Sequence, residues 1–175
     1  MAGFSFDQVA PDVDERPLPG EAPEDMVVRV AAAKALAVGG EPGTVVVAAD
    51  TTVVVDGEAL GKPADDAAAV AMLLRLSGRA HRVLTGWAVA VDGSVRRCGV
   101  EGSTVSIRPV TEDEARRYAA CGEPLDKAGA YALQGEGRRF VEGVEGSKSN
   151  VIGLPLGPVV AALASVGVTR SESPA

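Results

Sequence analysis

The sequence predicts a single α/β domain in which helices flank a β-sheet, and three observations support this. At 175 residues, the chain is long enough for one domain with a full hydrophobic core. Aromatic residues make up only 3%, so the core must consist mainly of Val, Ala and Leu, and β-branched runs favour strands. Between these runs lie segments with apolar residues at helical spacing. We expect one domain over residues 1–170, followed by a frayed tail at 171–175.

The charge and the composition exclude several classes of protein. The formal net charge of −7 argues against broad electrostatic binding of nucleic acid or of an anionic membrane, because both need a basic surface. Two cysteines are too few for a disulfide framework or a zinc site. No apolar stretch reaches the length of a membrane span, and the first residues lack the pattern of a signal peptide. We therefore expect a cytoplasmic protein.

The first elements of the chain are a weak strand, a loop and a helix. Weak alternation predicts a strand over Phe4–Val9, and an acidic, proline-rich loop comes next over 11–23. Residues 24–38 have helical spacing, and two glycines end this helix. Lys34 shares the apolar face of the helix with Val27 and other valines.

A buried strand and a second helix are predicted next. Residues 45–55 are almost wholly apolar and lead through Asp56-Gly57, a tight hairpin turn, into a second strand. Asp65 or Asp66 can cap a helix that runs through about Leu76.

The middle of the sequence predicts an antiparallel pair of strands. Residues 82–91 and 95–107 are joined by Asp92-Gly93, a hairpin signal. Thr111 and Glu114 then form a capping-box pattern that opens a short helix.

The last part of the chain is predicted to be a loop-rich region and a helix. Residues 123–148 contain many glycines and charges, which is typical of a functional edge. We expect a final helix with Leu156, Val160 and Leu163 facing inward.

Two charged residues in apolar elements are candidates for chemistry. Asp50 interrupts a core strand, where an ionised carboxylate is costly unless it meets a metal, a cation or several donors. The alternative is a carboxylate that only caps a strand bend. Lys34 needs a nearby anion if its ammonium stays on the apolar helix face, whereas a lysine can also extend outward to solvent.

Further candidates lie in bends and loops. Lys62 has its backbone restricted by the following proline and could point reproducibly at a phosphate, or it could be an ordinary solvated lysine. Asp126 and Lys127 pair opposite charges, and the Gln134 amide can pair with the edge of a nucleobase, unless it is solvated. His81 is the only histidine, so we expect a structural role for it and disfavour a Ser-His-Asp triad.

Together, several motifs resemble the Maf family of nucleoside triphosphate pyrophosphatases over nearly the whole chain, in order and spacing. These are Ala49-Asp50-Thr51-Thr52-Val53-Val54, Gly61-Lys62-Pro63, Leu76-Ser77-Gly78 with His81, Thr85-Gly86, Asp126-Lys127-Ala128-Gly129-Ala130-Tyr131, Gln134-Gly135 and Val151-Ile152-Gly153-Leu154-Pro155-Leu156. The resemblance implies an α/β fold related to inosine triphosphate pyrophosphatases, with a mixed β-sheet, flanking helices and two lobes around a cleft. It also implies a homodimer and a divalent metal such as Mg²⁺ or Mn²⁺.

The resemblance also implies roles for individual residues. Asp50 matches the family's proton acceptor and would also bind the metal, in a reaction that converts a nucleoside triphosphate to the monophosphate and pyrophosphate. Lys34 and Lys62 would bind the substrate phosphates. Thr51 and Gln134 match the branch that acts on dTTP and UTP. Additional support for the site is expected from Glu15, Asp126 and Lys127.

The resemblance begins after the family's opening strand, its Ser-x-Ser-Pro-Arg-Arg turn and the next helix, because Gly3-Phe4-Ser5-Phe6 matches the segment after that helix. Since arginines hold phosphates through paired donors, we expect this form to hydrolyse triphosphates more weakly than a form that carries them. The alternatives are a nucleotide-binding protein of impaired activity, and a dimerising module without catalysis. Phosphate release from dTTP would distinguish an active enzyme from a nucleotide-binding protein of impaired activity. Nucleotide binding would distinguish either of these from a dimerising module.

Overall fold

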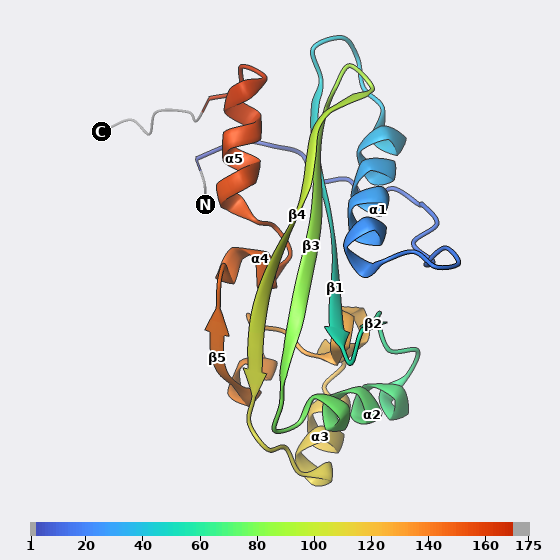
Figure 1. Cartoon of the computed structure of the whole chain (residues 1–175), viewed down its shortest axis with the longest axis vertical. Coiled ribbons are helices and arrows are strands. Elements are labelled where there is room, and N and C mark those ends of the chain that lie inside the picture. Colours follow the sequence, from blue (N-terminus) through green and yellow to red (C-terminus); the bar gives the residue numbers. More distant parts are fainter. Residues whose placement is uncertain (1–2, 170–175) are drawn as a thin grey trace.

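A computed structural model describes residues 3–169, which form one sheet with helices around it (Figure 1). The predicted tail at 171–175 lies outside the described residues. In the sheet, the strands have the order β2-β1-β3-β4-β5, and all four pairings are antiparallel. The strands are β1 (Val45–Val55), β2 (Glu58–Leu60), β3 (Ala80–Val91), β4 (Ser94–Ile107) and β5 (Val141–Glu145). The α/β architecture with flanking helices is therefore confirmed. The expected mixed sheet is wrong, because every strand pairing among the described residues is antiparallel.

The helices and the hairpins arise from local signals in the sequence. Both predicted hairpin turns are present, and in each turn both central residues have positive φ, as in Asp56 at 54° and Gly57 at 80°. Asp65 caps its helix by accepting a hydrogen bond from the Ala68 N–H, and Thr111 forms the predicted capping box. The helices are α1 (Pro23–Val38), α2 (Asp66–Leu76), α3 (Glu112–Ala119), α4 (Lys148–Ile152) and α5 (Leu156–Ser165).

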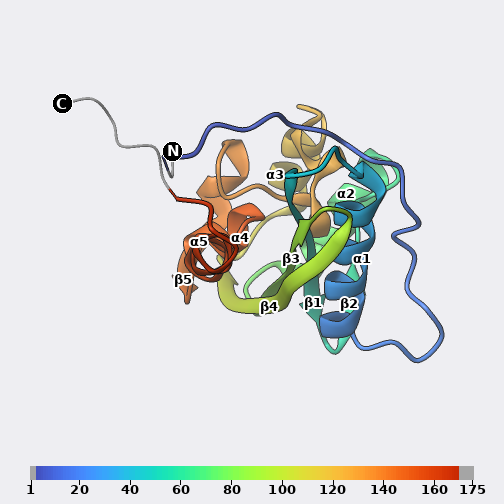
Figure 2. The same ribbon diagram turned by 90° about the horizontal axis from the view of Figure 1, so that it is seen from above.

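The helices α1 and α5 cover opposite faces of the long β3–β4 hairpin (Figure 2). On one face, α1 approaches β3 so closely that a Cβ at Gly86 would overlap the carbonyl group of Val27. On the other face, α5 packs against Trp87 and Val89. A separate and larger core cluster lies beside α2 and α3 at the other end of the sheet (Figure 1). Lys34 is on the α1 side, next to β1.

Two expectations about individual segments need correction. Phe4–Val9 is not a strand, because it pairs with no other strand; Phe4 packs into the core cluster below α5, whereas Phe6 is 78% exposed. Residues 123–148 are more regular than expected, since long-range pairing with β4 creates β5. The same region contains three short 3₁₀ helices, which are η1 (Glu123–Asp126), η2 (Ala128–Ala130) and η3 (Glu136–Phe140).

The buried face of α5 differs in part from the predicted one. Leu163 is buried as expected, but Leu156 is 41% exposed because the buried face begins one turn later, at Val159. Between residues 3 and 169, no helix is both long and apolar enough to cross a bilayer.

Candidate active site

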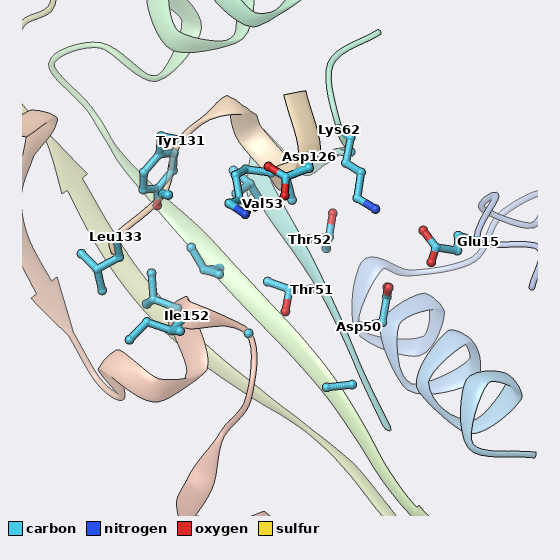
Figure 3. A pocket seen from close by; sticks show the side chains of 18 of the residues that line it. Glu15, Asp50, Thr51, Thr52, Val53, Lys62, Asp126, Tyr131, Leu133 and Ile152 are labelled. Atoms are coloured by element: carbon cyan, nitrogen blue, oxygen red, sulfur yellow. Dashed lines mark hydrogen bonds and ion pairs between the residues drawn. The ribbon is translucent and has the colours of Figure 1, made fainter. Parts of the chain in front are cut away.

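A cavity of about 430 Å³ opens beside β1, and all eight site residues predicted from the sequence line it (Figure 3). They come from separate parts of the chain: the N-terminal segment, α1, β1, the bend after β2, and the 3₁₀ region. At one end of the view lie Asp50, Glu15 and Lys62, and at the other lie Leu133 and Ile152. The eight predicted residues are Glu15, Lys34, Asp50, Thr51, Lys62, Asp126, Lys127 and Gln134.

Asp50 and Lys34 form an ion pair at the boundary between sheet and helix. Asp50 is opposite Gly86 in the β1–β3 register, and the close approach of α1 at Gly86 brings the helix over this part of the sheet. Lys34 Nζ lies 2.7 Å from Asp50 Oδ1 and 2.6 Å from Glu15 Oε1. The expectation that Lys34 meets an anion is therefore confirmed, and its alternative, extension to solvent, is wrong.

The side chains of Asp50, Lys34 and Glu15 shift one another's pKa values. Burial raises the pKa of Asp50 above its ordinary value, although Lys34 partly offsets this. Burial alone would lower the pKa of Lys34, but hydrogen bonds to Asp50 and Glu15 outweigh it and raise the pKa. The hydrogen bond from Lys34 lowers the pKa of Glu15. Lys34 therefore stays charged, and Asp50 is a stronger base than an exposed aspartate.

Lys62 is held at the cavity by its backbone rather than by an ion pair. The carbonyl of the preceding residue, Gly61, accepts a hydrogen bond of 3.1 Å from the Gly129 N–H, which connects the bend to the 3₁₀ region. Within residues 3–169, the Lys62 ammonium forms no ion pair with protein, so it is available to an anionic ligand. Asp126 and Lys127 instead pair with each other at 2.8 Å, and the Asp126 side chain is 72% exposed. They form the rim of the cavity.

The orientation of Thr51 is set by a buried chain of hydrogen bonds. Thr85 donates its single hydroxyl hydrogen to the Asn150 carbonyl at 2.9 Å, so Thr51 must be the donor in its 2.8 Å contact with Thr85. The Asn150 amide in turn donates to the Val83 carbonyl and to Ser103. This network anchors α4 to the sheet and thereby places the neighbouring residue Ile152 at the cavity.

Gln134 lines the cavity and directly follows Leu133 in the chain. Leu133, Tyr131 and Ile152 lie together at the apolar end (Figure 3). In the described part of the chain, the Gln134 side-chain amide has no hydrogen-bond partner, so its donor and acceptor are both free for a ligand. His81 donates to or accepts from the Tyr131 hydroxyl at 2.8 Å and is buried, which confirms its expected structural role.

The family model for Maf-like proteins matches residues 1–166. The chain belongs to the Maf family. Its relatives include proteins named dTTP/UTP pyrophosphatase from Geobacter metallireducens (48% identical, covering 95% of this chain and 88% of the relative) and Myxococcus xanthus (52%, covering 93% and 83%). A protein of the same name from Anaeromyxobacter dehalogenans is 50% identical and covers 94% of this chain and 85% of the relative.

Some lining residues of this Maf protein were not predicted as part of the site. Tyr131, Leu133 and Ile152 form its apolar end, although their motifs support the family resemblance. A scan for charged or amide groups cannot find them, because their side chains have no distinctive chemistry. Only the structure shows that Asn150 is fully buried and anchors the segment before Ile152.

The donor set fits a divalent metal that also binds substrate. Glu15 and Asp50 both contact Lys34 Nζ, so their carboxylates lie close together. No third acidic, histidine or cysteine side chain joins them in a metal-binding group within residues 3–169. Two carboxylates suit Mg²⁺ or Mn²⁺, which complete their coordination with water and substrate phosphate oxygens, and do not suit a closed zinc site.

Proposed function

We propose that this chain hydrolyses dTTP and UTP to the nucleoside monophosphate and pyrophosphate. The observation that carries the proposal is one cavity that is lined both by the Asp50–Lys34 ion pair and by Gln134, whose side-chain amide has no hydrogen-bond partner among the described residues. The cavity can accommodate a triphosphate at the charged end and a base at the apolar end. The names of the relatives support the same substrates.

In the proposed reaction, Asp50 accepts a proton from the attacking water. The water oxygen forms a bond to the α-phosphorus, and the bond from this phosphorus to the α,β-bridging oxygen breaks, so that pyrophosphate leaves. Because its pKa is raised by burial, Asp50 holds the proton more readily than an exposed aspartate. The ammonium of Lys34, 2.7 Å away, stabilises the ionised carboxylate that acts as the base.

The two lysines have different roles in the proposal. Lys34 has three N–H donors, of which two are used by Asp50 and Glu15. The third is free for a phosphate oxygen, so Lys34 can bind substrate and orient Asp50 at the same time. Within the described residues, the Lys62 ammonium forms no ion pair with a carboxylate. No ion pair therefore has to break before this ammonium neutralises charge on the phosphates.

The charge of the cavity supports the need for a metal. Three acidic residues and three lysines line it, so their formal charges cancel. A triphosphate would therefore bring negative charge that these side chains do not neutralise. Glu15 and Asp50 would hold a Mg²⁺ or Mn²⁺ ion, which polarises phosphoryl oxygens and lowers the pKa of bound water when present.

Thr51 and Gln134 are proposed as specificity residues. The Gln134 amide can pair with a carbonyl and an adjacent N–H on a uracil-like base. Thr51 keeps its hydroxyl hydrogen on Thr85, so it presents only acceptor lone pairs and its methyl group to the cavity. Asp126 and Lys127 would support the site from its rim.

Pyrophosphate release from a panel of nucleotides tests this proposal. With Mg²⁺ or Mn²⁺ present, kcat/KM should be higher for dTTP and UTP than for dATP and GTP, since a site that pairs with one base edge rejects others. A preference for a purine nucleotide would contradict the assignment. Calorimetric binding of dTTP without release of pyrophosphate would instead identify a nucleotide-binding protein that lacks activity.

A homodimer and a cytoplasmic location remain predictions. The resemblance to the family is the basis for the dimer, and light scattering of the purified protein would test it. The two isolated cysteines, which suit a reducing compartment, are a basis for the cytoplasmic location.

A further inference from the structure

A carboxylate outside the cavity ties together two segments of the 3₁₀ region. Glu123, the first residue of η1, accepts hydrogen bonds from the Tyr118 hydroxyl at 2.7 Å, the Gly137 N–H at 3.1 Å and the Glu136 N–H at 2.9 Å. The Tyr118 oxygen also accepts a hydrogen bond of 3.3 Å from the Ala132 N–H. We call Tyr118, Glu123 and their three main-chain partners the Glu123 hub.

The hub holds the loop that carries Gln134 on both sides. Ala132 lies two residues before Gln134, and Glu136 lies two residues after it. Gly135 has φ of 155°, and a Cβ at this position would be 2.5 Å from Glu123 Oε2. The positive φ favours glycine here, and the backbone next to Gln134 passes directly beside the Glu123 carboxylate, which three hydrogen bonds hold in place.

The hub is anchored in the protein core by the Tyr118 ring. Tyr118 is 1% exposed and packs edge-on against Phe140. Burial would raise the pKa of Glu123, but the hydrogen bonds from Tyr118, Gly137 and Glu136 together hold it below its ordinary value. Glu123 is thus ionised and acts as an acceptor, and a neutral amide could not accept all three bonds.

We propose that Glu123 is a positioning residue for base recognition, acting through Tyr118 and the main chain on both sides of Gln134. The proposal rests on the proposed function, in which the Gln134 amide contacts the base. Glu123 itself does not line the cavity. Its loss should weaken selection of the base, while Asp50, Lys34 and Lys62 remain in place because other elements carry them.

Glu123→Gln tests this role, because it keeps the shape of the side chain and replaces one acceptor oxygen with a donor. Glu136→Gln is a matched control: its carboxylate lies in the same loop and pairs with Arg139 rather than with a hydrogen-bonding group of the hub, and its main-chain N–H is retained. Tyr118→Phe provides a second hub variant that keeps the buried ring. Each variant is first shown to melt cooperatively, and hydrogen exchange is then measured for the amides of residues 132, 136 and 137.

Hydrogen exchange reports whether the loop is held by the hub, and steady-state kinetics with dTTP and dATP report whether base selection depends on it. In Glu123→Gln, we expect faster exchange at these amides, a rise in KM for dTTP of about tenfold with kcat nearly unchanged, and a similar loss of preference for dTTP over dATP. Tyr118→Phe should change in the same direction, and Glu136→Gln should resemble the wild type. An equal loss of kcat/KM for dTTP and dATP, an unchanged preference, or unchanged exchange would overturn the proposal.

The exchange measurement also separates this proposal from the proposed function. If the wild type does not cleave dTTP, the proposed function fails. Discrimination between dTTP and dATP is then measured by calorimetric binding in place of the hydrolysis assay. Faster exchange together with weaker discrimination in Glu123→Gln still supports the positioning role. Unchanged exchange or unchanged discrimination overturns it.

Discussion

Replacing Asp50 with Asn should abolish most of the hydrolysis and leave the fold intact. The Asp50 side chain is only 13% exposed, and its oxygen accepts from Lys34 at 2.7 Å. The Asn oxygen can still accept from Lys34, and Lys34 keeps its second ion pair, with Glu15 at 2.6 Å. The substitution therefore leaves no buried charge without a partner, and it also removes the repulsion between Asp50 and Glu15.

The magnitude is set by the loss of a general base. Such a loss typically lowers the rate by about 10²-fold to 10⁴-fold, which corresponds to about 3 to 5 kcal/mol in the activation free energy. The effect on folding should stay near ~1 kcal/mol, or roughly 2 to 4 °C in Tm for a protein of this size. The variant should thus separate catalysis from stability by several kcal/mol.

The assay is pyrophosphate release from dTTP over a range of pH. A base must be deprotonated, so wild-type kcat/KM should fall as the pH drops through the pKa of Asp50. Since burial raises that pKa, this fall should occur at a higher pH than for an exposed aspartate. Asp50→Asn should lose the acidic limb together with most of the activity.

Asp66→Asn is a suitable control, because Asp66 is exposed on α2 and does not line the cavity. It should retain the activity and the pH profile of the wild type. If Asp50→Asn shows near wild-type turnover and the same Tm, Asp50 is not the base and the reasoning from its burial fails.

Two further predictions concern stability. Burial lowers the pKa of His81 to about 4, below its ordinary 6.5, so the unfolded chain binds more protons between these values. The free energy of unfolding should therefore fall by at most about 3 kcal/mol as the pH drops from 6.5 to 4. Urea unfolding of the wild type and of His81→Gln over this pH range measures the effect. If the free energy of unfolding depends on pH in the same way in both proteins, the prediction is refuted. Gly86→Ala should destabilise by at least about 3 kcal/mol, because the new methyl group would overlap the Val27 backbone and not a flexible side chain. Gly143→Ala, with open space at its Cβ, should be nearly neutral in the same thermal unfolding assay, and equal Tm values for the two variants would contradict the packing argument.

Local signals in the sequence determined most elements of the fold. The Thr111–Glu114 capping box and the two Asp-Gly hairpin turns need only short-range hydrogen bonds and backbone angles, so they form as predicted. The strand β5 could not be predicted in this way, because its pairing with β4 joins residues far apart in the chain. Phe4–Val9 shows the opposite case, since weak alternation does not make a strand without a partner.

For the candidate site, the sequence by itself determined which residues carry unusual chemistry. Asp50 in an apolar strand and Lys34 on an apolar helix face each required a charged partner, because an unpaired charge is costly away from water. Only the tertiary structure decided that they are each other's partners and that Glu15 completes the group. It also decided that Glu123, an ordinary surface residue by sequence, accepts three hydrogen bonds. Burial and partner geometry depend on how distant segments pack, and no local pattern encodes them.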